Sequence, residues 1–345
     1  NVDFKEDGSE GGSETGLKKN DSAADTIRRR YGSPRDINRL FIAMLRAAGL
    51  DARVAELTTR DENFFHRSFP DAFQLNSEVT AVIGRDGSIQ FYDPGTQYCP
   101  PGMLSWEKEG VTALVYGKRD SRFVDTPVTD AARNGECRNL TVSLLNDGGV
   151  DVQVELKTVG QRAVELRNEL DDLTPDERRN RVVTTAHDLL PDATINESSV
   201  IFSNLTDGAA PLITSYSFDA AQFATRTEKR LLLRPSLLSH RDESLLTEPR
   251  RSNSVYFHSP WSESERVIIK APARYTPEQL PDPVDIDIGA ARYRSTFTLD
   301  GRNVVYERQL MVNAIIFRVD QYPTVKAFFD RVRQADRAAI SFKQF

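Results

Sequence analysis

The chain has 345 residues, of which 39% are hydrophobic and 28% charged, and its formal net charge at pH 7 is -6. This length exceeds the roughly 150 residues of a typical domain, so we expect two domains. Charges of both signs are mixed along the chain, which argues against a nucleic-acid surface, because phosphate binding needs clustered Lys and Arg. No apolar run reaches the roughly 18–20 residues that cross a bilayer, so we expect no transmembrane segment.

The N-terminal end combines a polar stretch with two predicted helices. Residues 1–21 are rich in Gly, Ser and charged residues, which is typical of a disordered linker. A short helix is predicted over residues 22–31. The next helix carries an apolar stripe at i, i+3, i+4 spacing, and Ser33 suits its N-cap and Pro34 its first position. Gly49 supplies the C-terminal stop.

The rest of the first predicted domain is a small antiparallel sheet. Its strands are expected at residues 52–57, 78–83, 88–92 and 112–116. Residues 61–76 show no clean period and contain four phenylalanines, so we expect a long loop packed by its own aromatic rings. One main helix against this sheet gives an α+β domain over residues 22–127.

After Pro127 the pattern becomes that of a β-rich domain, residues 128–345. A turn at residues 146–149 joins two segments of period-2 alternation, which predicts a hairpin. Helices are predicted only at residues 174–190 and 322–335. We therefore expect a mostly antiparallel β-sandwich-type domain with one or two helices.

The cysteines and acidic residues predict neither a metal nor a cofactor. Cys99 and Cys137 do not lie in a Cys-x-x-Cys pair, and the four histidines are widely spaced. The two cysteines could form a disulfide in an oxidising compartment or remain free thiols. Asp282, Asp285 and Asp287 follow one another closely, but the Gly and Glu of a calcium loop are missing.

Residues 31–50 read Tyr-Gly-Ser-Pro-Arg-Asp, followed by a predicted helix that ends in Leu-Arg-Ala-Ala-Gly-Leu. This stretch resembles the core motif of the transglutaminase-like superfamily. It is most similar to bacterial proteins in which such a domain lies between β-rich domains of unknown function. In that family a Cys begins the helix, a His lies on the next strand and an Asp follows one strand later. Residues 75–82 and 91–96 offer the matching segments in the same order, and the resemblance covers about residues 22–345.

The chain departs from this family at the two reactive positions. Pro34 stands where the family has its Cys and Ser77 where it has its His, while Asp93 is retained. Proline has no nucleophile, and a serine hydroxyl cannot act as a general base near neutral pH. Ser33 lies one residue early and is better explained as the helix cap than as a substitute nucleophile. The resemblance therefore implies the fold and a degenerate, non-catalytic member.

We expect a binding or scaffolding module whose candidate cleft, formed by Ser33, Ser77 and Asp93, holds a peptide or a glycan. The resemblance implies a bacterial secreted or periplasmic protein with an upstream β-rich domain in the same polypeptide. The alternative is a cysteine-type amidase, peptidase or transglutaminase-like enzyme with a rearranged site that uses Cys99 or His66. A thiol beside an imidazole at a helix N-terminus would support that alternative.

Overall fold

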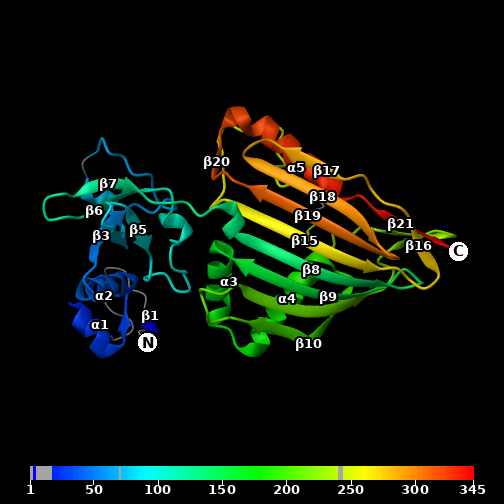
Figure 1. Ribbon diagram of the computed structural model, residues 1–345, viewed down its shortest axis with the longest axis horizontal. Helices are drawn as coiled ribbons and strands as arrows, with labels where there is room; N and C mark the ends of the chain where they lie inside the picture. The colour runs from blue at the N-terminus through cyan, green and yellow to red at the C-terminus, as the bar shows by residue number, and fades with distance from the viewer. Residues whose placement is uncertain (1–2, 5–17, 70, 240–243) are drawn as a thin grey trace. The chain divides into compact units, whose positions relative to one another are not determined.

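The computed structural model describes residues 3–4, 18–69, 71–239 and 244–345. The chain divides into two compact units, Asn1–Thr129 and Asp130–Phe345. The described residues are mostly β, in mainly antiparallel sheets, with five α-helices (Figure 1). No helix in these ranges is long and apolar enough to span a bilayer. Most of the linker predicted over residues 1–21 lies outside the described residues.

The first unit consists of two helices and a five-stranded antiparallel sheet in the order β5-β4-β3-β6-β7. Its main elements are α1 (Ala23–Arg29), α2 (Pro34–Ala47), β3 (Asp51–Leu57), β4 (Ser77–Ile83), β5 (Ile89–Tyr92), β6 (Thr112–Val115) and β7 (Arg122–Asp125). Short strands β1 (Asp3–Phe4) and β2 (Tyr31–Gly32) pair in parallel. The α2 helix packs against β3 and β4. The sheet core is formed by small and aliphatic side chains such as Ala55, Leu57 and Val79.

The ends of α2 are those that the sequence predicts. The Ser33 hydroxyl accepts a hydrogen bond from the Asp36 backbone N (3.3 Å), and the Asp36 carboxylate accepts one from the Ser33 backbone N (3.1 Å). This reciprocal capping box satisfies two backbone donors that the helix itself leaves unpaired. Pro34 occupies the first helical position, and Gly49 adopts a left-handed φ of +83° just after the helix. The predicted cap and stop are confirmed.

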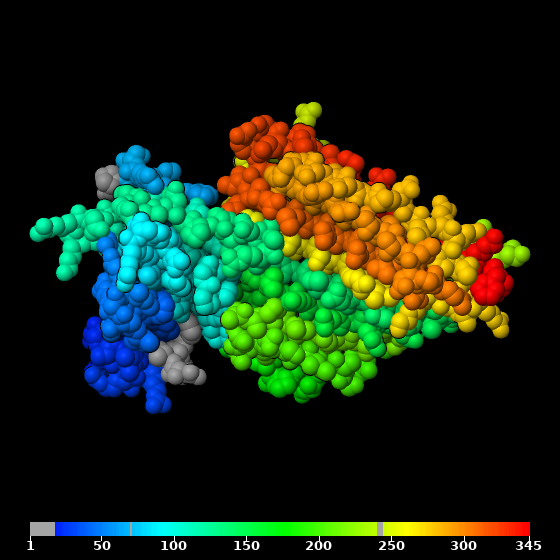
Figure 2. All heavy atoms as spheres, viewed as in Figure 1, coloured from blue at the N-terminus to red at the C-terminus, as the bar shows by residue number. Residues whose placement is uncertain are grey.

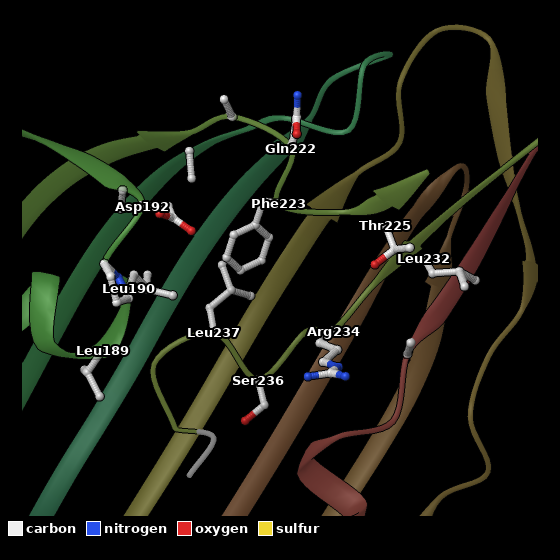
Figure 3. A pocket seen from close by; sticks show the side chains of 15 residues that line it. Leu189, Leu190, Asp192, Gln222, Phe223, Thr225, Leu232, Arg234, Ser236 and Leu237 are labelled. Atoms are coloured by element: carbon white, nitrogen blue, oxygen red, sulfur yellow. The ribbon is translucent and has the colours of Figure 1, made fainter. Parts of the chain in front are cut away.

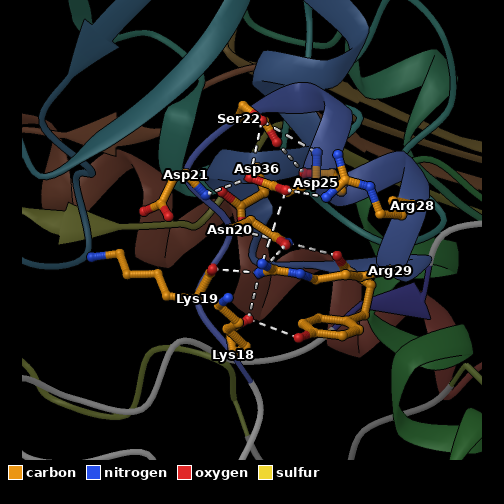
Figure 4. Close-up of polar contacts among 11 residues, drawn as sticks. Lys18, Lys19, Asn20, Asp21, Ser22, Asp25, Arg28, Arg29 and Asp36 are labelled. Atoms are coloured by element: carbon orange, nitrogen blue, oxygen red, sulfur yellow. Dashed lines mark hydrogen bonds and ion pairs between the residues drawn. The ribbon is translucent and has the colours of Figure 1, made fainter.

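A polar network holds the residues before α1 against the start of α2 (Figure 4). The Asn20 amide donates to the Tyr31 carbonyl (2.8 Å) and to the Asp36 carboxylate (3.4 Å). The Arg29 guanidinium donates to Asn20 Oδ1 (3.1 Å) and to the Lys18 carbonyl (3.0 Å). Asp36 is thereby fixed from two sides, so the helix start has one defined geometry.

The second unit is built on an eight-stranded sheet in the order β10-β11-β9-β8-β15-β19-β18-β17 (Figure 1). Its strands are β8 (Gly135–Leu144), β9 (Val150–Val159), β10 (Ala193–Ser203), β11 (Leu212–Ala220), β15 (Trp261–Lys270), β17 (Val284–Asp287), β18 (Ala291–Asp300) and β19 (Asn303–Val312). Neighbouring strands are antiparallel except β8 and β15, which run parallel. Figure 2 shows the side chains over this sheet as one continuous surface that changes from green to orange.

Smaller elements cover one face of this sheet. They are α3 (Gln161–Asp171), α4 (Pro175–Leu189), α5 (Tyr322–Asp336), a four-stranded sheet of β12 (Thr225–Arg226), β13 (Arg230–Leu233), β21 (Ile340–Gln344) and β16 (Tyr275–Gln279), and the pair β14 (Val255–Tyr256) and β20 (Ile316–Phe317). Leu140, Val267 and Tyr306 form one buried row across β8, β15 and β19, in a core that also contains Phe342 of β21. The opposite face carries exposed polar residues such as Arg266, as is usual for an antiparallel sheet with one solvated side.

The coarse prediction for this unit, mostly antiparallel β, is confirmed, but the number of helices is wrong. The described residues contain three α-helices here, where one or two are expected from the sequence. The missed helix is α3. Its buried face includes Gln161 and Arg167, and these polar residues interrupt the apolar stripe by which such a helix is recognised.

Candidate functional site

The three positions of the expected triad are carried by the start of α2, the start of β4 and the turn after β5. On the buried side of α2, the Asn38 amide donates to the Glu78 carbonyl at the start of β4 (3.0 Å). Gly95, in the turn after β5, lies so close to α2 that a Cβ there would be 2.5 Å from the Pro34 carbonyl oxygen. The helix start therefore packs directly on both segments.

Asp93 is bound to a lysine rather than to a histidine. Its side chain is fully buried, and both carboxylate oxygens accept hydrogen bonds from Lys108 Nζ at 2.9 Å. The Thr96 hydroxyl (2.7 Å) and the Ser105 backbone N (3.3 Å) donate to the same carboxylate. Lys108 is itself buried and also donates to Thr96 Oγ1 (3.1 Å). The retained carboxylate is therefore neutralised by an ammonium group inside the unit.

The other two triad positions offer no reactive group. Pro34 is exposed in the first turn of α2. Ser77 is half-buried and pairs with Leu57 at the first position of β4. The hydroxyl of Ser33 is engaged in the capping box, which agrees with its predicted role as the helix cap. A thiolate or a general base at these positions would have to come from elsewhere.

Cys99 and His66, the residues of the alternative site, have other environments. The Cys99 thiol donates to the Met103 carbonyl (3.3 Å), and burial, followed by the Asp93 carboxylate, raises the pKa of this thiol. The thiol is therefore held in its protonated, weakly nucleophilic form. His66 is exposed, and its backbone N donates to the Gln74 side chain (2.9 Å). Cys99 and Cys137 are both free thiols.

Residues 61–76, which we call the aromatic loop, join β3 to β4 and lead directly into Ser77. Phe64 and Phe69 are each 61% exposed and Phe73 is 95% exposed. The expectation that the loop is packed by its own aromatic rings is therefore wrong for three of the four. Three exposed phenyl rings on one loop offer apolar surface that can bind another molecule.

Hydrogen bonds hold the backbone of the aromatic loop in place while its rings project outward. The Gln74 side chain donates to the Phe69 carbonyl (2.7 Å) and accepts from the His66 backbone N (2.9 Å). The Asn76 amide, at the end of the loop, donates to Thr59 Oγ1 (3.0 Å), two residues before the loop begins. The rings are thus displayed on a cross-linked backbone.

Two arginines of α2, Arg35 and Arg39, bind Glu78, the residue after Ser77, and we call this pair the arginine border. The buried Glu78 carboxylate accepts from Arg35 Nε (3.1 Å) and Arg39 Nε (3.3 Å). The two arginine side chains remain 59% and 49% exposed, so each guanidinium has donors available to solvent or to a bound molecule. These hydrogen-bond donors are therefore anchored on Glu78, two residues after the end of the aromatic loop.

Sequence reasoning identified Asp93 and missed Lys108. Lys108 belongs to a run of charged residues, Glu-Lys-Glu, that is typical of a solvated segment. No spacing rule links it to Asp93, because the turn that brings them together is irregular. Among the residues that the structure describes, no group of three His, Cys, Asp or Glu could hold a metal ion.

Comparison with known proteins agrees with the sequence resemblance. Residues 5–99 match the model of the transglutaminase-like superfamily, and residues 229–342 match that of a domain of unknown function, DUF3858. No curated protein matches the chain.

One solved structure is similar in fold: the crystal structure of "a putative protease from Parabacteroides distasonis", with a TM-score of 0.51 and 12% sequence identity. The match covers 93% of this chain and 46% of that one, so this chain spans about half the length of its neighbour. At this identity the similarity concerns the fold alone. The family match over residues 5–99 agrees with the order of the helix and strands in the first unit, so this part of the chain is similar to the transglutaminase-like superfamily.

Proposed function

We propose that the transglutaminase-like domain is non-catalytic and serves as a binding module for a peptide. The observation that carries the proposal is the buried ion pair of Asp93 and Lys108. In a thiol-imidazole-carboxylate triad the carboxylate orients and stabilises the imidazole. Here that carboxylate is saturated by other donors, and the positions of the nucleophile and base are Pro34 and Ser77.

The catalytic part of the proposal is tested by activity. The purified protein is incubated with a glutamine-containing dipeptide and hydroxylamine, for transamidation, and with labelled casein, for proteolysis. We expect rates equal to those without protein. Turnover that disappears in Cys99→Ala would instead support the rearranged site, and turnover that survives both Cys99→Ala and Asp93→Ala would contradict the assignment of this site.

A second test rebuilds the missing groups. A thiol in the first turn of a helix has a lowered pKa, so Pro34→Cys combined with Ser77→His should introduce a reactive thiol at the triad position. Because the Asp93 carboxylate is paired with Lys108, it cannot orient the new imidazole, and we expect turnover only in the triple variant that also carries Lys108→Met. Turnover in the double variant with Lys108 intact would show that the ion pair does not block the triad.

The binding part of the proposal follows from the aromatic loop and the arginine border. Exposed phenyl rings on a cross-linked backbone can bury apolar side chains with little loss of conformational freedom. The half-exposed guanidinium groups of Arg35 and Arg39 can donate to peptide carbonyl or carboxylate oxygens. Together they suit an extended peptide with apolar side chains.

A peptide display library and a glycan array, screened in parallel, test the ligand class. We expect selected peptides to lose about tenfold or more in affinity with Phe73→Ser, since burial of a phenyl ring contributes about 1.5–3 kcal/mol. Phe345→Ser is the matched control, because that ring is 79% exposed and lies in the second unit. Binding of glycans alone would overturn the peptide assignment. An unchanged peptide affinity in Phe73→Ser would overturn the assignment of the aromatic loop as the binding surface.

We also infer from the family resemblance that the protein is bacterial, secreted or periplasmic, with an upstream β-rich domain. The greater length of the structural neighbour supports the idea of a larger architecture. Sequencing the complete gene and fractionating cells test these two points. A gene without an upstream β-rich domain, or a protein confined to the cytoplasmic fraction, would contradict them.

A further inference from the structure

The second unit contains a pocket of about 510 Å³, remote in sequence from the family motif. Four segments line it: the end of α4 with the turn to β10, the segment from the end of β11 to β12, β13 with the residues that follow it, and Ala339 just before β21. This volume lies within the roughly 300–1,000 Å³ of small-molecule sites. All of its lining residues belong to this one unit.

The centre of the pocket is apolar. Figure 3 shows the side chains of Phe223 and Leu237 at its middle, with Leu190 to one side of them. Leu237 is almost fully buried, and Phe223 is partly buried against the same core. An aliphatic or aromatic group of a ligand placed here would be removed from water on several sides, which favours binding.

Two opposite charges flank this apolar centre. Asp192 lies to one side of Phe223 and Leu237, and Arg234 lies to the other (Figure 3). Within the described part of the chain, neither side chain makes a hydrogen bond or an ion pair. Both are exposed at the rim, so their charges are available to a ligand.

The rim also carries local backbone strain. Gln222 has a left-handed φ of +55°, which a residue with a side chain adopts only at a cost. This residue forms the turn that places Phe223 over the pocket. Strained residues of this kind are concentrated where a turn must present a neighbouring group in one orientation.

We propose that this pocket binds a small zwitterion with apolar side chains, of the size of a dipeptide. The carboxylate of the ligand pairs with Arg234, its ammonium group pairs with Asp192, and its side chains pack on Phe223 and Leu237. The arrangement matches a ligand with separated opposite charges better than a purely apolar one, because both rim charges then gain a partner. The inference concerns the second unit and does not depend on the function proposed for the first.

Isothermal titration calorimetry on the full chain tests this proposal with leucine, leucyl-leucine, N-acetyl-leucyl-leucine and leucyl-leucinamide. The acetyl group removes the ammonium charge, and the amide removes the carboxylate. We expect leucyl-leucine to bind and each blocked dipeptide to bind about tenfold or more weakly. Leucine, whose two charges lie on one carbon and cannot reach both rim charges, should also bind more weakly than leucyl-leucine.

Variants assign each charge to its partner. Arg234→Gln should abolish the difference between the dipeptide and its amide, and Asp192→Asn the difference between the dipeptide and its acetylated form. Arg331→Gln and Asp300→Asn, at exposed positions outside the pocket, should bind as the wild type does. Phe223→Ala should lower the affinity for every ligand that binds. The proposal is overturned if no probe binds at millimolar concentration, or if binding is unchanged in both Arg234→Gln and Asp192→Asn.

Discussion

Both units bury a carboxylate against a cation, but they do so in different ways. In the first unit the pair is local: Asp93 and Lys108 lie 15 residues apart, in a turn and a short 3₁₀ helix. In the second unit Arg308 of β19 makes a bidentate pair with Asp336 at the end of α5 (2.9 and 3.0 Å). Arg308 also donates to Glu263 of β15 (3.2 Å).

The second arrangement extends across the sheet. Glu265 of β15 lies between Arg138 of β8 and Arg308 of β19 in register, and all three side chains are on the buried face. We call these residues, with Glu263 and Asp336, the sheet network. Burial raises the pKa of Glu265, although its neighbours Arg138 and Arg308 act in the opposite direction.

The comparison shows that a buried ion pair is not by itself a sign of function. The pair of Asp93 and Lys108 informs about function only through the proposal that Asp93 corresponds to the carboxylate of the family triad. The sheet network contains more charges, yet no such position is involved. Its members come from distant strands, so we expect it to matter more for the stability of its unit than the local pair does.

The two tryptophans allow the units to be followed separately. Trp106 lies in the first unit and Trp261 in the second. In a Trp106→Phe background fluorescence reports unfolding of the second unit, and in a Trp261→Phe background that of the first. Urea titrations of the full chain in these two backgrounds therefore measure the free energy of unfolding of each unit.

The largest effect is expected for Arg308→Met. The substitution leaves Asp336 buried without its guanidinium, so the second unit should lose about 3–5 kcal/mol of its free energy of unfolding. Arg266→Met is the matched control on the neighbouring strand. Arg266 is 48% exposed and lies 3.5 Å from Glu307, so its loss should cost only about 0–1 kcal/mol. Equal losses in the two variants would remove the distinction between network and surface pair.

A smaller effect is expected for Lys108→Met in the first unit. Asp93 keeps its hydrogen bonds from Thr96 and Ser105 but loses the ammonium, so we expect a loss of about 2–3 kcal/mol. Adding Asp93→Asn should restore part of this stability, because the buried charge is then gone. If the two losses simply add in the double variant, Asp93 and Lys108 are not coupled.

The pH dependence of the second unit should show the raised pKa of Glu265. The folded state keeps this proton to a higher pH than the unfolded chain, whose Glu pKa is about 4.3. The contribution of Glu265 to stability is therefore complete below about pH 4.3 and is lost as the pH rises through the folded pKa. Relative to Glu265→Gln, the wild type should lose at most about 1.4 kcal/mol per pH unit. A constant difference between the two from pH 4 to 8 would contradict this.

The stability contribution of Glu278, on β16, should change with pH in the opposite direction to that of Glu265. The hydrogen bond from Arg230 lowers the pKa of Glu278 to about 2. Its contribution is therefore present above about pH 4.3 and lost as the pH falls toward 2. The difference in stability between the wild type and Glu278→Gln should shrink over that range, and no change with pH would count against the assigned ion pair.

The smallest effects are expected at the helix caps, one in each unit. Ser33 caps α2 and Thr174 caps α4, and each forms a capping box with the acid three residues on. Ser33→Ala and Thr174→Ala should each cost about 1 kcal/mol in their own unit and nothing in the other. Loss of stability in both units from one substitution would show that they do not unfold independently.

The sequence predicts the elements whose signals are local. The cap, stop and apolar stripe of α2 lie within one turn of the positions they define, so its bounds are correct. The α3 helix is missed because Arg167 lies on its buried face, where its guanidinium donates to the Ala210 carbonyl (2.6 Å). The rings of the aromatic loop are misplaced because composition does not tell whether a Phe faces the core or the solvent.

The two buried charge sites also differ in how far the sequence predicts them. The position of Asp93 follows from the order of strands, but its partner depends on an irregular turn. The sheet network does have a sequence signal that could have been read. Arg308 falls in step with the apolar positions Val304, Tyr306 and Leu310 on β19, so strict alternation places it on the buried face.

The parallel contact between β8 and β15 has a consequence for how the second unit is made. Residues 145–260 separate these strands in the chain, and β8 joins β9 long before its other neighbour exists. During synthesis the outer edge of β8 therefore remains unpaired, a state that invites association with other chains. Any fragment that ends before residue 261 retains this open edge permanently, and we expect it to aggregate at concentrations at which the full chain stays dispersed.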